Sequence, residues 1–172
     1  YENIQEAKRA SEEAVLFTLL NEMIGFCRDT TQKEKALAYC DELLKLLKKM
    51  QLEGSVEYAT ALLNIANAYR AFALLQESSE LFAKVEGIYK EHLPANDFGY
   101  ANLYNNWALT YQESENYEEA IRVLKLALQI VDSYVDAVVP QATTRTNLAT
   151  TLIQMGSEEC YAEAIGYLQE GY

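Results

Sequence analysis

The chain has little proline and glycine, with 2 Pro and 7 Gly among 172 residues. Since these residues interrupt helices and mark turns, their scarcity leaves room for long helices. No alternating run of β-branched residues predicts a strand, and no glycine-rich phosphate loop is present. Together with plentiful Ala, Leu, Glu and Gln, these absences exclude a parallel sheet with a nucleotide loop and predict an all-α fold.

Positive charge is also scarce, because 14 Lys and Arg face 26 Asp and Glu and leave a net charge of −12. Such a chain is repelled over long range by nucleic acid and by anionic membranes, so we expect neither as a main partner. The negative charge is expected to keep the outer helical faces soluble. It also favours basic ligands, weakly.

Cysteine and histidine are too few for a disulfide framework or a zinc site. Cys27, Cys40 and Cys160 show no CxxC spacing, and His92 is the single histidine. We therefore expect no metal, no cofactor and a reducing, cytoplasmic location. There is no apolar run long enough to span a bilayer and no signal-peptide pattern. The chain begins at Tyr1, so the protein is expected to be longer at its start.

No group of residues indicates catalysis. His92 stands at a predicted helix end beside Leu93 and Pro94, where a helix-terminal charge is the expected role. The pairs at 118–119 and 158–159 are expected to be solvated carboxylates, and neither HExxH nor GxSxG occurs. We expect a protein that is not an enzyme.

Internal repetition is the most informative property of the chain. Three segments superpose when they begin at Ala59, Ala101 and Ala142, with offsets of 42 and 41 residues. These segments share an asparagine and, two residues later, an alanine that we use as the register mark: Asn64 with Ala66, Asn106 with Ala108, and Asn147 with Ala149. The second helices of the predicted hairpins also share a small residue, which is Ala36, Ser78, Ala120 and Ala164 in turn. This predicts one domain of four helical hairpins, at about 11–52, 55–94, 97–138 and 140–172.

The hairpin at residues 100–128 shows the pattern most clearly, with Trp107 and Tyr111 on one face of its first helix. Helix starts are predicted at Thr31 with Glu34, at Ser55, at Asn96–Asp97, and at Asn116 with Glu119. The first helix is expected from about residue 2 to 27, with Phe26 on its apolar side. The helix after Asn116 is expected to continue toward Val139.

These features resemble the tetratricopeptide repeat family over essentially the whole chain. The residues that carry the resemblance are Trp107-Ala108 with Tyr111, Ala120, Leu124 and Ala127, and Ile65-Ala66 with Tyr69, Ser78, Phe82 and Val85. The period near 42, longer than about 34 in the usual repeat, is similar to kinesin light chains and many bacterial proteins. The resemblance implies a right-handed α-solenoid whose first helices line a concave groove.

In that register, the groove positions form an uncharged stripe with arginine at one edge. The candidate peptide-binding residues are Asn64, Asn67, Arg70, Asn102, Asn105, Asn106, Gln112, Thr143 and Asn147. Carboxamides both donate and accept, so they can pair with a peptide backbone, a use that the resemblance also implies. In the alternative, Asn64, Asn106 and Asn147 bond across adjacent repeats and order the stack. The divergent first repeat places Thr18, Asn21, Glu22, Gly25 and Arg28 at the same positions.

The sequence predicts a non-enzymatic scaffold that binds a protein or peptide segment. One alternative is a peptide-sensing regulatory domain of a larger bacterial regulator, whose output domain lies outside these residues. Another is self-association through the C-terminal hairpin, since Ile165 and Leu168 are expected to be uncovered. Tyr58, Tyr100 and Tyr104 could anchor a ligand, although packing between repeats is the expected role of each.

Overall fold

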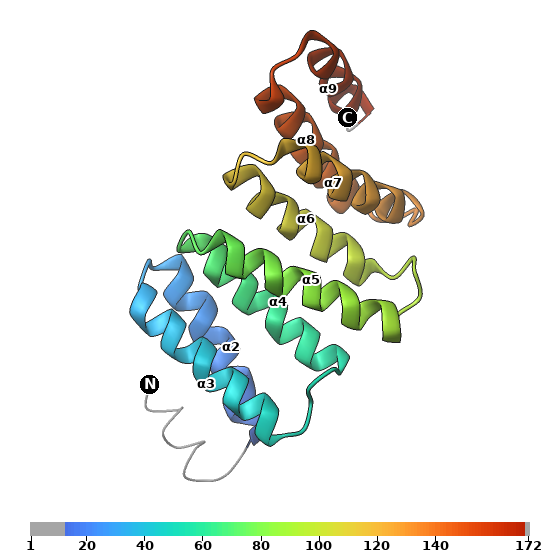
Figure 1. The fold of residues 1–172 in the computed structure, drawn as a ribbon. Coiled ribbons are helices and arrows are strands. Elements are labelled where there is room, and N and C mark those ends of the chain that lie inside the picture. The colour runs from blue at the N-terminus through green and yellow to red at the C-terminus, as the bar shows by residue number, and fades with distance from the viewer. Residues whose placement is uncertain (1–12, 171–172) are drawn as a thin grey trace. The chain divides into compact units, whose positions relative to one another are not determined.

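The computed structural model describes residues 13–170, so the start of the predicted first helix and of the first repeat lies outside the described residues. Eight α-helices and no strand occur within residues 13–170, which confirms the all-α fold. In the order of Figure 1 they are α2 Glu13–Asp29, α3 Lys33–Lys49, α4 Val56–Ala71, α5 Leu75–His92, α6 Phe98–Glu113, α7 Tyr117–Asp132, α8 Val138–Met155 and α9 Glu158–Glu170.

The helices pack as four consecutive hairpins, α2 with α3, α4 with α5, α6 with α7, and α8 with α9. They fall into two compact units of two hairpins each. Unit 1 ends at His92 and unit 2 begins at Leu93. This boundary lies beside Pro94, between the second and third predicted repeats. Each unit is described by itself below.

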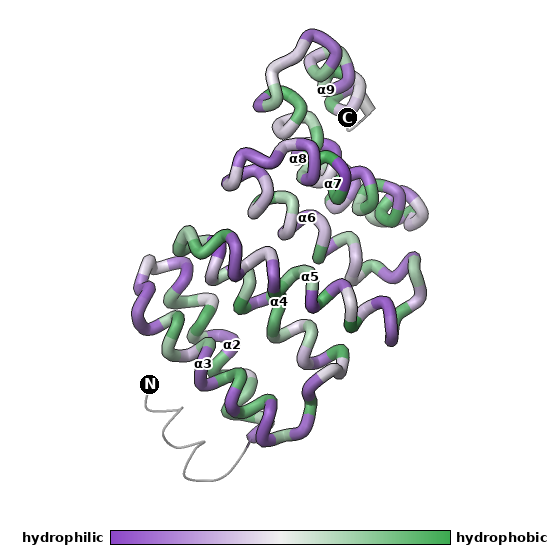
Figure 2. The backbone as a smooth tube through the Cα atoms, viewed as in Figure 1, coloured by the Kyte–Doolittle hydropathy of each residue, from purple (hydrophilic) through white to green (hydrophobic). Residues whose placement is uncertain are grey.

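Small residues hold the paired helices close together. Ala66, Ala108 and Ala149 at the register mark are 0% exposed, so the facing helix packs directly on the backbone there. In the second helices Ala36 and Ala120 are also 0% exposed. Hydrophobic and hydrophilic residues alternate along the helices, as Figure 2 shows, because each helix buries one face in its unit.

Unit 1 differs from unit 2 at one of these small positions. Ser78 takes the place that Ala120 has in unit 2, and it is 0% exposed. Its Oγ donates to the Ala66 carbonyl oxygen at 2.9 Å. The buried hydroxyl is therefore satisfied, and it ties the two helices of the hairpin together at the register mark.

Three of the predicted helix starts are confirmed. Ser55 Oγ accepts from the Tyr58 N–H at 3.1 Å, and Asp97 Oδ1 accepts from the Gly99 N–H at 2.7 Å. Asn116 Oδ1 accepts from the Glu119 N–H at 3.4 Å. Each side-chain oxygen satisfies an N–H that the first helical turn leaves unpaired.

The predicted cap at Thr31 is wrong, because the residue before α3 is Gln32, which makes no side-chain cap. Thr31 has φ 57° and closes the end of α2 instead. Its N–H donates to the Arg28 carbonyl at 3.1 Å, and the Gln32 N–H donates to the Cys27 carbonyl at 2.8 Å. A residue in this left-handed conformation cannot take the extended backbone that a cap residue needs.

The turn inside each hairpin contains one residue in the left-handed backbone conformation. Thr31, Ala73 and Glu115 all have φ between 57° and 59°, and Gly156 has φ 82°. Around Ala73, the Leu74 N–H donates to the Tyr69 carbonyl at 2.9 Å. Such a turn closes the first helix and reverses the chain within a few residues. Only the last hairpin uses glycine, the residue that takes this conformation at least cost.

The expected continuation of α7 toward Val139 is wrong, because this helix ends at Asp132. Ser133 Oγ donates to the Ile130 carbonyl oxygen at 2.7 Å, which competes with helical pairing at that carbonyl. Pro140 lies in the first turn of α8, where a missing N–H removes no helical bond.

Two of the three thiols are buried. Cys27 and Cys40 are buried, and Cys160 is partly exposed; all three are free. Burial, and secondarily the charge of Asp41, raises the pKa of Cys40 to about 12, so its thiol stays protonated and unreactive. No helix within the described residues has the length and apolar content needed to cross a membrane.

Candidate functional site

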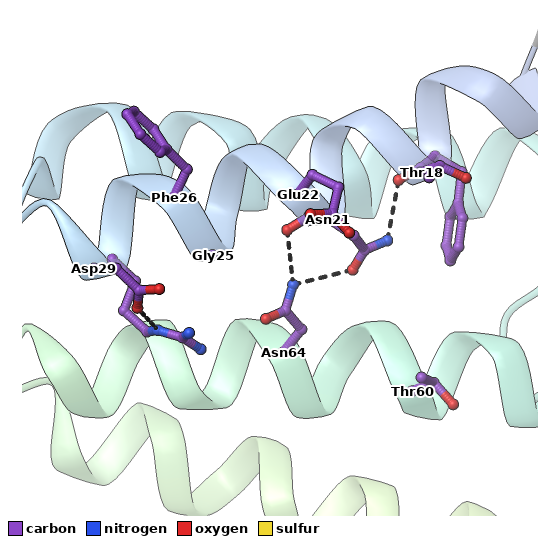
Figure 3. A pocket seen from close by; sticks show the side chains of 10 residues that line it. Thr18, Asn21, Glu22, Gly25, Phe26, Asp29, Thr60 and Asn64 are labelled. Carbon is purple, nitrogen blue, oxygen red and sulfur yellow. Dashed lines mark hydrogen bonds and ion pairs between the residues drawn. The ribbon is translucent and has the colours of Figure 1, made fainter.

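An asparagine pair joins the two first helices of unit 1. The Asn64 Nδ2 on α4 donates to the Asn21 carbonyl oxygen at 3.2 Å and to Asn21 Oδ1 at 3.1 Å (Figure 3). The Asn21 Nδ2 in turn donates to the Phe17 carbonyl at 3.0 Å. The Asn64 amide donor is therefore used between adjacent hairpins, as in the stack-ordering alternative.

Unit 2 contains the equivalent pair, with more support around it. The Asn147 Nδ2 on α8 donates to Asn105 Oδ1 on α6 at 3.0 Å. Asn105 Nδ2 donates to Thr144 Oγ1 at 2.9 Å and to the Ala101 carbonyl at 3.0 Å. Nearer the ends of these helices, Gln112 donates to Thr151 Oγ1 at 2.5 Å. The candidates Asn105, Gln112 and Asn147 thus connect α6 and α8.

Asn106 bonds differently from Asn64 and Asn147. In both pairs the acceptor stands three residues before the register mark of one hairpin, a position held by Ile24 in the first hairpin and by Ala108 in the third. The donor stands two residues before the mark of the next hairpin. Asn106 donates instead to Asn102 on its own helix, at 2.8 Å to the carbonyl and 2.9 Å to Oδ1.

The remaining candidates divide between the surface and the interior. Asn102 and Thr143 are exposed, and Arg70 is half-buried. Asn67 is only 9% exposed, and its Oδ1 has no hydrogen-bond partner among the described residues. A side chain so enclosed does not present its amide on the surface, so Asn67 is left out of the binding surface considered below.

The three tyrosines that were candidate ligand anchors are buried in the structure. Tyr58 is 5% exposed, Tyr100 is 4% and Tyr104 is 7%. The Tyr58 hydroxyl lies 2.8 Å from Lys84 Nζ, on the neighbouring helix of its hairpin. Burial of all three rings leaves little aromatic surface for a ligand.

A pocket of about 660 Å³ opens beside the asparagine pair of unit 1 (Figure 3). Its lining comes from α2 and the first half of α4: Phe17, Thr18, Asn21, Glu22, Gly25, Phe26, Arg28, Asp29, Thr60 and Asn64. We call it the unit 1 pocket. It includes all five groove positions of the divergent first repeat. Among the candidates of the later repeats, it includes only Asn64.

Phe17, Phe26 and Asp29 are pocket residues that the repeat register did not select. Phe26 was expected on the apolar side of its helix, but its side chain is 56% exposed. The buried residues of α2 are Leu16, Leu20, Ile24 and Cys27. Phe26 stands two positions after Ile24 and therefore on the other side of the helix. This phase difference is the sequence signal that could have revealed it.

Some charged side chains of the unit 1 pocket form an ion pair, and one does not. Arg28 Nε lies 2.8 Å from Asp29 Oδ1, so the one cation of the lining is paired locally. Glu22 is exposed, and its carboxylate has no hydrogen-bond or ion-pair partner among the described residues. Gly25 leaves open space, because a Cβ at this position would meet no atom within 4 Å other than those of its two chain neighbours and of its own helix backbone. The pocket thus offers a free carboxylate beside an uncovered stretch of helix.

A second pocket, of about 350 Å³, lies in unit 2 and is more apolar. It is lined by Phe98, Gly99, Ala101, Asn102, Asn105, Val131, Val139, Pro140 and Thr143. We call it the unit 2 pocket. Val139 is 74% exposed at its edge, and Val138 is 67% exposed. It brings together the candidates Asn102, Asn105 and Thr143. Within residues 13–170, no cluster of His, Cys, Asp or Glu is arranged to hold a metal ion.

Comparisons with known proteins agree with this arrangement of hairpins. A family model described as Tetratricopeptide repeat matches residues 99–172. These residues are thus similar to tetratricopeptide repeats. The match lies in unit 2. In unit 1 the small residues Ala36, Ala66 and Ser78 stand at the corresponding positions, and both hairpins have a left-handed turn, although Ile24 replaces the small residue in the first helix. A search of curated proteins finds no match.

Solved structures extend the tetratricopeptide-like fold to both units. The crystal structure of BtubC (BKLC) from P. vanneervenii matches with a TM-score of 0.81 and 16% identity over 92% of this chain. The chain spans 63% of the length of that protein. TPR-like repeats described as a kinesin light chain from Podosopora anserina match with a TM-score of 0.62 and 14% identity, covering 90% of this chain and 93% of theirs. At these identities the likeness concerns the fold alone.

Proposed function

We propose that this chain is a non-enzymatic protein-interaction module and that the unit 1 pocket holds a segment of an extended peptide. Tetratricopeptide repeats serve as protein-interaction scaffolds, which supports the general role. The observation that carries the specific role is the pocket itself, because it lies on the repeat's groove positions and falls within the size range of ligand sites.

The lining suits a peptide backbone with one or two recognised side chains. Thr18 and Glu22 are exposed, and the Asn21–Asn64 pair holds two carboxamides at fixed positions between α2 and α4. Because the pair is held by hydrogen bonds, little side-chain freedom is lost when a ligand contacts it. Phe17 and Phe26 supply apolar area at the pocket edge.

Gly25 provides a test that does not depend on weakening the fold. Replacing it by leucine fills open space, and it favours the helix by about 1 kcal/mol, since glycine is a poor interior helix residue. We expect Gly25→Leu to unfold at higher denaturant concentration. We also expect it to bind at least about tenfold more weakly to peptides selected by the wild type from an immobilised random nonapeptide array.

Gly87→Leu is the matched control. Gly87 lies within α5, outside the pocket, and a Cβ there also meets no atom within 4 Å. This variant should gain similar stability and bind the selected peptides as the wild type does, measured by fluorescence anisotropy. Equal binding by both variants, or no peptide selected by the wild type, would contradict the proposed function.

We propose the surface of α6 around Asn102 and Asn106 as a second contact surface. Asn102 and Asn106 stand on the surface of α6 and are not engaged with α8, and the neighbouring unit 2 pocket suits an apolar side chain. We expect Asn106→Ala to leave the helical circular dichroism unchanged and to weaken capture of the same peptides by about threefold. Loss of helical signal would assign Asn106 to the stack instead.

Self-association is a second candidate function, favoured by exposed apolar residues on the last hairpin. Ile153, Met155, Tyr161, Ile165 and Leu168 are each 38–56% exposed. If they bind a second copy, light scattering will show a mass that rises with concentration, and Ile165→Glu will abolish the rise. A constant monomer mass for the wild type would contradict this candidate.

The regulatory alternative requires an output domain outside these 172 residues, so the full reading frame tests it. A DNA-binding or enzymatic segment in that frame would support the alternative, and its absence would contradict it. The free thiols of Cys27, Cys40 and Cys160 support the proposed cytoplasmic location.

A further inference from the structure

We propose that the unit 1 pocket selects a peptide with a lysine or arginine side chain, held by Glu22 and by the ring of Phe26. This inference rests on the proposed function and specifies its ligand. Glu22 and Phe26 are four residues apart on α2, so their side chains are neighbours on one helical face. Both line the pocket, and both are exposed.

The charge balance of the lining favours a cation. The lining contains two carboxylates, Glu22 and Asp29, and one guanidinium, Arg28. Arg28 is already bonded to Asp29 at 2.8 Å, which leaves the charge of Glu22 uncompensated within the described residues. An incoming ammonium or guanidinium group would supply the counter-ion that the pocket lacks. The net charge of −12 adds attraction for basic segments at long range.

The aromatic ring gives the pocket a second means of recognising a cation. Phe26 is 56% exposed, so the face of its ring is accessible to a ligand. A cation over a ring face is attracted by the ring quadrupole, and the aliphatic stem of lysine or arginine packs on the same ring. An exposed ion pair alone is weak, and the ring is therefore expected to contribute measurably beside Glu22.

The open space at Gly25 gives the long basic side chain a path along the helix. Gly25 stands between Glu22 and Phe26 in the sequence, and apart from its two chain neighbours and the nearby backbone of its own helix, no atom lies within 4 Å of the place a Cβ would take. A bulkier residue there would narrow the approach to the Glu22 carboxylate. The Asn21–Asn64 pair, at the same pocket, is positioned for the peptide backbone next to the basic residue.

The test uses the purified chain and four fluorescein-labelled nonapeptide libraries. Their flanks are degenerate, and their central residue is fixed as lysine, arginine, norleucine or glutamate. We expect the lysine and arginine libraries to bind about tenfold more tightly than the norleucine library and the glutamate library to bind most weakly. The preference should shrink between about 50 mM and about 300 mM NaCl, because salt screens exposed charges.

Two variants assign the preference to the named residues. Glu22→Gln should reduce the preference for a cation from about tenfold to about threefold, the part that the Phe26 ring supplies, and Phe26→Leu should weaken the basic libraries about threefold. Glu91→Gln is the matched control, because it removes the same charge from an exposed residue at the end of α5, outside the pocket. This control should keep the full preference.

The outcomes separate the two proposals. If the wild type binds lysine, arginine and norleucine libraries equally, or if Glu22→Gln keeps the full preference, the inference about the cation is wrong and peptide binding stands. If Gly25→Leu binds every library as the wild type does, or if no library binds, the proposed function itself is wrong.

Discussion

Units 1 and 2 contain the same asparagine pair but surround it differently. In unit 1, Asn64 reaches Asn21 beside an open pocket that carries a free carboxylate. In unit 2, Asn147 reaches Asn105, which also bonds to Thr144. The shared pair indicates that these asparagines connect adjacent hairpins. The residues around the pair differ, and they are where we expect binding specificity.

The two pockets differ because different residues close them. Phe98, Val131, Val139 and Pro140 make the unit 2 pocket apolar. The unit 1 pocket instead lies along α2, where its lining includes both charged and aromatic residues. A repeat fold can thus keep one stacking interaction while each unit presents a different surface.

The largest losses of stability are expected from substitutions in the hydrophobic core, at one register position that the hairpins share. Phe82 and Leu124 occupy it in units 1 and 2 and are 0% exposed, whereas Leu168 occupies it in the last hairpin and is 38% exposed. We expect Phe82→Ala to lower the free energy of unfolding by about 3–5 kcal/mol and Leu124→Ala by about 2–5 kcal/mol.

Leu168→Ala should cost less than about 1 kcal/mol in the same urea titrations, because less contact area is lost. If Leu168→Ala costs as much as Leu124→Ala, the C-terminal hairpin is covered in solution. That result would support self-association. It would also contradict the expectation that the exposed position contributes less to stability than the buried ones.

Smaller losses of stability are expected from substitutions in the two asparagine pairs. Asn64→Ala and Asn147→Ala each remove a bond between hairpins, and we expect each to cost about 1–2 kcal/mol of unfolding free energy. Asn106→Ala removes only an exposed bond within one helix and should cost no more than about 0.5 kcal/mol. Equal costs at all three positions would show that the bonds between hairpins stabilise the chain no more than a bond within one helix does.

The smallest effects are expected at the left-handed turns, and they should have opposite signs in the two units. Ala73→Gly relieves a non-glycine residue at φ 59° and should stabilise the chain by about 0.5–1 kcal/mol. Gly156→Ala introduces that penalty at φ 82° and should destabilise by about 1 kcal/mol.

The backbone alone causes the expected loss at Gly156, because a Cβ there meets nothing nearer than 3.9 Å. Thermal unfolding followed by circular dichroism would measure both variants. A change of the same sign in both would show that side-chain contacts, and not the conformation of the turn, control stability at these positions.

Much of the fold could be predicted from particular residues. The repeated alanines at 66, 108 and 149 located the hairpins, and Ser55 and Asp97 located two helix starts, because capping chemistry is local. Thr31 misled the prediction, since the same residue type closes one helix or opens the next depending on its backbone conformation.

The candidate site could be predicted less well. The register placed Asn64 and Asn147 on the correct helices, but it could not say whether their amides face a ligand or the next hairpin. It also could not show that Asn67 is enclosed or that Phe26 is exposed, because both depend on how neighbouring helices pack.

By itself, the sequence determined the helices, their turns and the 42-residue register, because capping, helix periodicity and small residues at contacts act over a few residues of chain. Only the tertiary structure decided which polar residues bond to one another and which remain open. The Asn21–Asn64 bond joins residues 43 positions apart, and the space beside Glu22 exists only once α2 and α4 lie together. Hydrogen bonding and exposure of a side chain are properties of its neighbours in space, so a pattern along one helix does not contain them.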